Sequence, residues 1–467
     1  MKIPRQAQNL LGRIVSGIWD WDASRPTRER ATGHIPHADD PKQELTQRDR
    51  RELLRFSRWL YKNSGVVHGA INDMATYSVG KGILLHAQSR DETFNEQAEA
   101  LWTEWAKIAD VRGQLDLREL TLSWSRAIDR DGEVFVILTE DRFGIPHLQT
   151  VSSHNVKSDD FNAPDNEHDG VATNNVGRPV AYIVNGRRVA ARDILHIYDP
   201  MYHDALRGVS SLACCINNLF DIREILKFEK QGVKLNSAIA TTIKTNQPAD
   251  GAGFLGNKSK ADSADENVTL EQIIGGGTIP RLAPGEELES HTSNRPSQTF
   301  DGFINHFIRD LASGIGLPYE FIWDPTNLSG TTNRFVLEKA QRRFEQRQET
   351  LIKHLNRIYT WFISKQIERG TLSRVDQWWK AEWSRPRKIT VDAGRDSKAD
   401  IEEIKMGIKT YAECYSKRGL MWREQFRQRA IEEMTLDLLS NEYNVDKARI
   451  AQRTPNETET ATTDDDE

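Results

Sequence analysis

The sequence predicts an α+β fold in which a few unusually long helices are combined with short strands. Two observations support this class. Apolar residues recur at helical spacing over long stretches, most clearly over residues 208–237 and 333–369. Runs rich in β-branched residues, such as DGEVFVIL (131–138) and ILHIYDP (194–200), are bounded by turn residues and predict strands.

The composition is that of a soluble globular protein. The chain has 467 residues, of which 37% are hydrophobic and 28% charged, and its formal charge is −6. A net negative chain has no global basic field for nucleic acid, so any DNA contact would have to be local or weak. The three cysteines, Cys214, Cys215 and Cys414, predict no disulfide framework, and no Cys/His spacing matches a zinc site. The start lacks a continuous apolar segment, so we predict no signal peptide, and no apolar run is long enough for a membrane span.

The N-terminal half predicts an α+β unit behind a loosely ordered arm. Residues 1–45 form the arm, and a helical pattern begins near Gln43. KGILLHAQ predicts a short strand, and residues 91–108 and 115–130 predict amphipathic helices. Strands with turns at Asn185-Gly186 and Asp199-Pro200 complete the unit, which extends to about residue 205.

The C-terminal half is more helical. Residues 208–237 predict one long helix, IATTIKT a strand, and GTIPRLAPGEELESHTS two short strands around a Pro-Gly turn. Residues 300–316 predict a helix that ends at glycine, and about 37 residues from Asn333 predict a helix roughly 55 Å long. Further helices follow to about residue 450, and the acidic tail at 451–467 is expected to be disordered.

A polar stretch, LPYEFIWDPTNLSGTTNR (317–334), separates two of these helices. A loop with Gly, Ser and Thr just before a helix could hold a phosphate, or it could be a plain connector. Three hydroxyl residues and a glycine on rigid helical supports favour a functional loop. The following helix has a basic face, which could be solvated, could contact phosphate or could pack against another subunit. Its residues are Lys339, Arg342, Arg343, Arg347, Lys353 and Arg357.

Motifs for catalysis are weak. GAGFLGNKS (251–259) nearly matches a phosphate-binding loop, but Asn257 separates the last glycine from the lysine, so we predict a surface loop. Asp129, Asp131 and Glu133 could form a metal or acid–base site, but DRDGE is also an ordinary helix-to-strand turn. His196 with Asp199 is an equally weak candidate. We therefore predict no catalytic residues, no metal site and no cofactor.

Several segments together resemble the portal proteins of tailed phages, lambda type. RRELLRFSRWLYKNSGVVHGAINDMATYSVGKGI resembles the family's opening segment, and RDGEVFVIL, ILHIYDP and RGVSSL resemble its centre. IRDLASGIGLPYEFIWDPTNLSGTTNR resembles its helix–loop–helix, with Thr331-Thr332-Asn333-Arg334 in place of the usual paired serine before arginine. PRKITVDAGRDSKADIEEIKMGIKTYAECYSKRG resembles its late region, so the resemblance covers roughly residues 45–430.

The resemblance implies a portal fold and a division of the chain into parts. The parts are an N-terminal arm (1–45), the first part of the wing (46–205), a stem helix (206–237), the clip (238–296), a second stem helix (297–319), a tunnel loop (320–333), the long helix with the second part of the wing (334–399), the crown (400–450) and the tail (451–467).

The resemblance also implies a function. About twelve copies would form a ring at one capsid vertex, in the virion, after assembly in the host cytoplasm. Double-stranded DNA would pass through it in packaging and ejection. Its partners would be the terminase large subunit, a head–tail adaptor, and the major capsid and scaffolding proteins, without a membrane. It would not be an enzyme. The alternatives are a metal-dependent DNA-processing enzyme, or a helical scaffold or adaptor without a channel.

The resemblance assigns Asn327, Leu328, Ser329, Gly330, Thr331 and Thr332 to the DNA channel. A duplex has one charge per about 1.7 Å of its axis, so a cationic loop would hold it, whereas neutral hydrogen bonds would let it slide. Phosphate or subunit contacts are expected from Arg334, Lys339, Arg342 and Arg343.

Overall fold

The computed structural model describes residues 45–159, 164, 166–238, 242–245, 286–289, 300–323, 329–389 and 393–450. Several expectations fall outside these residues: nearly all of the N-terminal arm, the loop at 251–259, the first of the two short strands around the Pro-Gly turn, and the acidic tail. The described part is a mixed α+β structure, which confirms the predicted class.

Polar caps fix where the first helices begin. Helix α3 (Gln47–Asn63) follows Thr46, whose hydroxyl accepts a hydrogen bond from the Asp49 amide, and α4 (Gly65–Val79) follows at once. Asp91 caps α5 (Glu92–Ala106), and Asp116 forms a full capping box with Glu119 at the start of α6 (Leu117–Asp131). Such side chains satisfy amides that lack a helical partner. The helices predicted over 91–108 and 115–130 are confirmed.

Three small antiparallel sheets pack with these helices. Strand β2 (Glu133–Glu140) lies between β3 (Pro146–Ser152) and β8 (Ile194–Tyr198). The second sheet contains β4 (Glu167–His168), β5 (Val171–Thr173), β6 (Pro179–Val184) and β7 (Arg187–Ala190). Asn185 and Gly186 both have positive φ in the β6–β7 hairpin, which is the turn the sequence predicts. The third sheet pairs β1 (Leu84–Ala87) with β11 (Ala381–Ser384).

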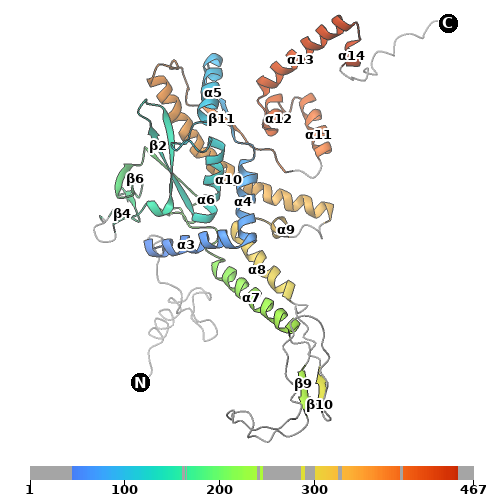
Figure 1. Cartoon of the computed structure of the whole chain (residues 1–467). Helices are drawn as coiled ribbons and strands as arrows, with labels where there is room; N and C mark the ends of the chain where they lie inside the picture. Colours follow the sequence, from blue (N-terminus) through green and yellow to red (C-terminus); the bar gives the residue numbers. More distant parts are fainter. Residues whose placement is uncertain are drawn as a thin grey trace, which may run out of the picture.

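The largest core is built around one helix, α10 (Gly330–Glu368), which crosses the middle of the molecule (Figure 1). At about 1.5 Å per residue its 39 residues span roughly 58 Å. Tyr359 and Phe362 of α10 meet Trp102 and Trp105 of α5, and Trp105 stacks on Phe362 with ring centroids 4.6 Å apart. Burial of so many aromatic rings fixes α10 against the N-terminal helices.

A pair of helices leads away from this body. Helices α7 (Ile216–Ala238) and α8 (Phe300–Ile315) lie side by side, with β9 (Thr242–Thr245) paired to β10 (Glu286–Glu289) beyond their far end (Figure 1). The sequence wrongly places the start of α7 at about residue 206–208. Residues 208–210 have no regular structure and residues 211–215 form turns, in which the Ala213 and Cys215 amides bond the carbonyl oxygens three residues earlier instead of four.

The C-terminal part is helical, as predicted. Its helices are α11 (Ala393–Lys405), α12 (Tyr411–Lys417), α13 (Trp422–Tyr443) and α14 (Lys447–Ile450), drawn in orange to red in Figure 1. No residue of α13 is buried, and Arg423 near its start forms ion pairs with Glu92 and Glu99 of α5. Within the described residues, no helix is both long enough and apolar enough to cross a bilayer.

Candidate functional site

The loop between α8 and α10 is shorter than the sequence predicts. Helix α8 ends at Ile315 and is followed by Gly316, which has φ +84°, and Tyr319–Ile322 form a helical turn, α9. Helix α10 begins at Gly330, three residues before the predicted start at Asn333. The predicted loop at 320–333 therefore includes helical residues at both ends. Of its expected channel residues, Asn327 and Leu328 lie outside the described residues.

The other four expected channel residues form the N-terminus of α10. Ser329 is the N-cap, and its hydroxyl oxygen accepts a hydrogen bond from the Thr332 amide and lies 2.8 Å from the Thr332 hydroxyl. Gly330, Thr331 and Thr332 form the first helical turn, and all four residues are exposed. This end of the helix presents neutral hydroxyls and backbone amides rather than cationic side chains.

The four predicted basic contact residues have different environments. Arg334 and Lys339 are exposed, and Arg342 is exposed in an ion pair with Glu338 one turn earlier, at 2.9 Å. Arg343 instead points inward: it donates to the carbonyl oxygen of Ile315 and lies 3.4 Å from Asp199. Arg343 therefore ties α10 to the end of α8.

The predicted basic face of α10 does not exist as one surface, because two of its arginines serve the fold. Arg347 is 1% exposed and forms a bidentate pair with Asp129 of α6, with nitrogen–oxygen distances of 2.7 and 3.1 Å. Arg357 donates to the carbonyl oxygens of Ala191 and Arg192. Arg347 therefore cannot reach a phosphate, and Arg357 is partly engaged in holding α10 to the segment before β8.

The candidate catalytic carboxylates are each occupied by cations. Asp129 binds Arg347, and its second neighbour is the Ser211 hydroxyl. Asp131 binds Arg58 and Arg130; burial opposes its ionisation, but these two hydrogen bonds lower its pKa below the usual value. The acids are close in sequence but do not form a shared site, because each is paired with different arginines, and they stabilise the junction of α6 and β2.

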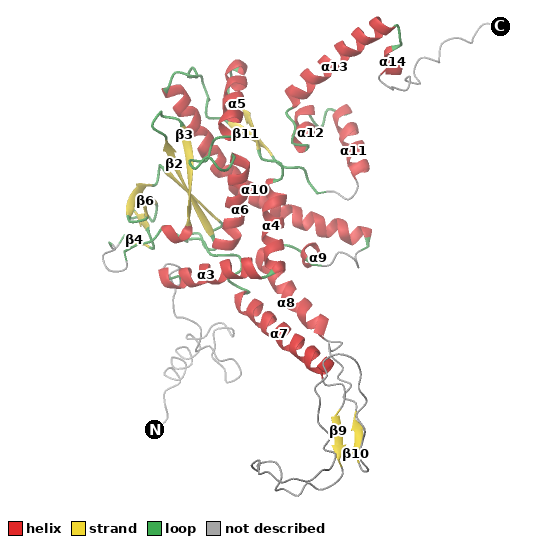
Figure 2. Cartoon of the chain, in the orientation of Figure 1, coloured by secondary structure: helices red, strands yellow, loops and turns green. Residues whose placement is uncertain are grey.

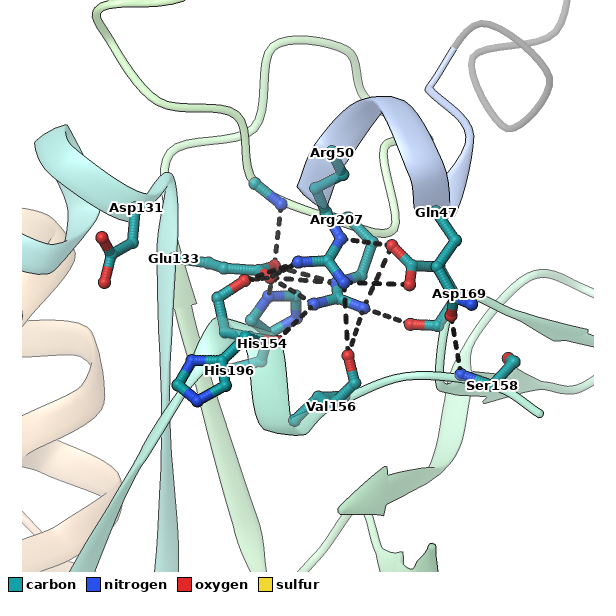
Figure 3. A network of polar contacts seen from close by, with 12 residues as sticks. Gln47, Arg50, Asp131, Glu133, His154, Val156, Ser158, Asp169, His196 and Arg207 are labelled. Carbon is teal, nitrogen blue, oxygen red and sulfur yellow. Dashed lines mark hydrogen bonds and ion pairs between the residues drawn. The ribbon is translucent and has the colours of Figure 1, made fainter. Parts of the chain in front are cut away.

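Glu133 is the centre of a fully buried polar network (Figure 3). It accepts from the guanidinium of Arg207, from the Gly208 amide at 2.9 Å and from Ser153 Oγ at 2.5 Å, and it lies 2.9 Å from His196 Nε2. Burial alone would raise the pKa of Glu133, but Arg207 and His196 hold it well below the usual value. Burial lowers the pKa of His196, although Glu133 opposes this.

The same network joins three separate parts of the chain. Arg50 of α3 pairs with Asp169 beside β4 and donates to Ser153 Oγ, while Arg207 donates to the carbonyl oxygen of Val156 (Figure 3). Local sequence gives no signal for Arg50, Asp169 or Arg207, since their partners lie far away along the chain. Among the described residues, no group of three or more His, Cys, Asp or Glu side chains could hold a metal ion. The arrangement is a structural junction at the base of the α7–α8 pair.

Comparison with known proteins gives consistent matches. The family model described as "Phage portal protein, lambda family" matches residues 27–348, more than half of the chain. "Portal protein B" of Escherichia phage lambda is 19% identical over 443 residues, which cover 80% of this chain and 82% of that protein. "Portal protein" of Escherichia phage N15 is 19% identical over 265 residues, which cover 51% and 50%. A solved structure described as "Neck of native GTA particle computed with C12 symmetry" is 17% identical, with a TM-score of 0.48, over 80% of this chain and 94% of that chain.

Proposed function

The chain belongs to the lambda family of phage portal proteins, and from that premise we propose that about twelve copies close into a ring around a channel for double-stranded DNA. As a portal protein it is a virion component at the capsid vertex. Packaging and ejection of DNA through the vertex are general functions of portals. The number of copies, the channel residues and the individual partners are the parts that we propose.

The observation that best supports a ring is the pair α7 and α8. These helices stand apart from the body (Figure 1). They expose large side chains: Phe228 is 58% exposed and Phe303 is 48% exposed. Exposed apolar side chains that gather on one surface mark sites of contact with another protein. Neighbouring copies arranged around an axis would cover them, with α7 and α8 as the stem.

The remaining parts follow the same scheme. We assign residues 46–205 and 334–399 to the wing and 400–450 to the crown. The segment 238–296, of which β9 and β10 are described, would be the clip that meets the terminase large subunit and later the head–tail adaptor. The major capsid and scaffolding proteins would surround the wing.

We assign the α10 N-terminus and the residues before it to the narrowest part of the channel. Exposed hydroxyls on Ser329, Thr331 and Thr332 would offer weak hydrogen bonds to passing phosphates. Ser329 already satisfies one of the free amides of the helix end, which leaves a weak site for an anion. Such a surface would guide a duplex without binding it strongly.

The protein would do this without enzymatic chemistry of its own. The carboxylates that could have bound a catalytic metal, Asp129, Asp131 and Glu133, are buried and held by arginines. If these carboxylates bound a metal ion instead, their arginine partners would be left buried and unpaired, at a cost of several kcal/mol. A separate motor protein would therefore supply the energy for translocation.

Native mass spectrometry of the purified protein, followed by negative-stain imaging of the same peak, tests this function. A closed ring of about twelve copies with a central hole is expected. A discrete dimer that cleaves DNA in the presence of a divalent metal would overturn the proposal and favour a DNA-processing enzyme. An open helical polymer without a channel would favour a scaffold.

A further inference from the structure

A polar cavity lies between the body and the C-terminal helices. Its volume is about 400 Å³, and residues of α5, α10, α12, α13, β1 and β11 line it. A second cavity of about 310 Å³ shares His86, Glu99, Trp422 and Arg423 with it. Arg423 of α13 pairs with Glu92 and Glu99 of α5. The junction between these parts is therefore hollow and polar rather than filled by apolar side chains.

The cationic side chains of the first cavity already have partners. Lys388 lies 3.1 Å from Glu345, and Arg385 lies 3.3 Å from Glu349. Burial lowers the pKa of His86, so this ring adds no positive charge near neutral pH. With the arginine of α13 also paired, the cations that line the cavity are all neutralised by carboxylates.

Two hydrogen-bond acceptors in the same cavity have no such partner. Glu382 of β11 is exposed and accepts one hydrogen bond, from Gln88 Nε2 at 3.3 Å, and among the described residues it forms no ion pair. Gln348 of α10 is 1% exposed, and its side-chain oxygen has no hydrogen-bond partner. A buried amide oxygen without a donor keeps the full cost of its desolvation. The last torsion of glutamine is soft, so the amide can turn toward a donor in the cavity. The groups that this cavity lacks are therefore positively charged donors.

The arrangement favours an organic cation over a metal ion. A metal ion needs several ligands that converge on one point, and within the described chain no group of three or more His, Cys, Asp or Glu side chains could hold one. The two acceptors come from different elements, and Trp383 of β11 and Trp422 of α13 also line the cavity. Methylene groups pack on apolar surface, while an ammonium group binds carboxylates and aromatic faces.

We propose that the cavity binds a linear aliphatic polyamine, with ammonium groups on Glu382 and Gln348 and with methylene groups against Trp383 and Trp422. Glu99 would be a further anchor, because burial raises its pKa and an added cation would favour its ionised form. Since the body and α13 both line the site, a bound polyamine would hold the C-terminal helices on the body. DNA carries a condensed layer of counterions, so a portal meets cations where it works. The site itself does not depend on the proposed ring or channel.

Isothermal titration calorimetry of the purified full-length chain with spermidine tests the site. Saturable binding at physiological salt is expected. Gln348→Leu and Glu382→Gln should each weaken the binding about tenfold, because each removes one acceptor of a charged donor. Glu442→Gln removes the same charge at the exposed far end of α13 and should leave the affinity unchanged.

Melting temperatures separate a ligand group from a structural one. Gln348→Leu removes an oxygen that has no partner, so without spermidine this variant should melt no lower than the unmodified chain. A lower melting temperature with unchanged affinity would show that Gln348 serves only the fold, and the proposed site would be wrong. If Gln348→Leu does not fold, the exposed Glu382→Gln decides the question alone.

Two further results would overturn the site. Absence of heat with spermidine would show that the cavity holds only water. Equal affinity in all variants, or equal heat with magnesium chloride, would show that the cation binds the acidic surface in general. Ring formation is measured separately, so these results leave the portal function standing.

Discussion

The ion pair between Arg347 and Asp129 shows how a single residue of α10 holds two distant parts of the fold. Both side chains are almost fully buried, and Arg347 also donates to the Ser125 carbonyl oxygen. A buried charge that loses its partner keeps its full desolvation cost. Loss of either partner alone should therefore destabilise the protein, even though replacing both with apolar side chains of the same shape could leave its stability unchanged.

Replacement of Arg347 by methionine should destabilise the protein by about 3–5 kcal/mol, because Asp129 would be left as a buried, unpaired carboxylate. Urea unfolding followed by circular dichroism measures this loss. Arg342→Met removes an arginine one turn earlier whose partner Glu338 is exposed, and should change stability by less than about 1 kcal/mol. Equal effects of the two substitutions would contradict the assigned role of Arg347.

Two histidines with lowered pKa values should make the folded protein less stable at acidic pH. Burial lowers the pKa of His354 to about 3, with Lys353 adding to the effect, and burial also lowers the pKa of His196. Below pH 6.5 the unfolded chain binds protons that the folded chain does not, so stability falls as pH falls. Each histidine contributes a slope of up to about 1.4 kcal/mol per pH unit. Urea titrations between pH 7.5 and 5 should show this slope. His354→Gln removes one of the two groups and should reduce the slope by up to about 1.4 kcal/mol per pH unit. An unchanged slope would refute the assignment.

At the scale of elements, the turn between α6 and β2 meets the segment before α7 at two touching glycines. Gly132 ends α6 with φ +87°, and a Cβ there would lie 2.7 Å from the Gly208 carbonyl oxygen. A Cβ on Gly208 would lie 2.1 Å from the Gly132 carbonyl oxygen. Only two glycines allow the α6–β2 turn to approach the segment that leads into α7.

Gly132→Ala should therefore destabilise the protein in two ways, by about 1–2 kcal/mol for the left-handed backbone and by roughly 1–3 kcal/mol for displaced neighbours. Gly113→Ala is the matched control, since Gly113 has φ +65° but no atom within 4 Å of an added Cβ. Thermal unfolding should show the larger loss at Gly132. If the two variants melt at the same temperature, the close approach does not contribute to stability.

The proposed channel loop predicts a charge effect on DNA movement. Asn327→Lys with Ser329→Lys would place two cations per copy at the channel wall, and the phosphates should then be held more strongly, which slows packaging. The measure is the fraction of particles with full-length DNA. Gln114→Lys with Thr371→Lys adds the same charge at exposed positions away from α10's N-terminus and should leave packaging unchanged. Normal packaging with the loop lysines would refute the loop's assignment.

The sequence predicts elements well where their signals are local. The caps at Asp91 and Asp116 and the Asn185-Gly186 turn are short-range devices, so α5, α6 and the β6–β7 hairpin are predicted correctly. The start of α7 is missed because buried Leu212 continues the helical spacing upstream, whereas Ser210 and Ser211 are bonded to Asp129, a residue remote in sequence. The burial of Arg347 is missed for the same reason, since its partner is 218 residues away.

At the scale of the whole molecule, the C-terminal helices are attached rather than embedded. Helix α13 has no buried residue, and Ile431, Met434 and Leu438 are all more than half exposed. The three hydrophobic cores of the described residues are formed by residues up to Ile389. The body should therefore fold without α11–α14.

A chain that ends at residue 389 should melt within a few degrees of the full-length protein in calorimetry. A chain that ends at residue 380 also loses β11, with the buried Trp383 and the only partner of β1 in the described sheet, and should melt far lower. Loss of the folded state in the longer truncation would show that the C-terminal helices are part of the core.

The pairing of β1 with β11 determines when their sheet can form during synthesis of the chain. Leu84 lies opposite Ser384, so 300 residues must be added after Leu84 before its partner exists. At about 5–20 residues per second, the ribosome needs roughly 15–60 s for this. During that time β1 has an open edge, which nascent chains on neighbouring ribosomes can pair with. The β1–β11 sheet therefore closes only when translation is nearly finished.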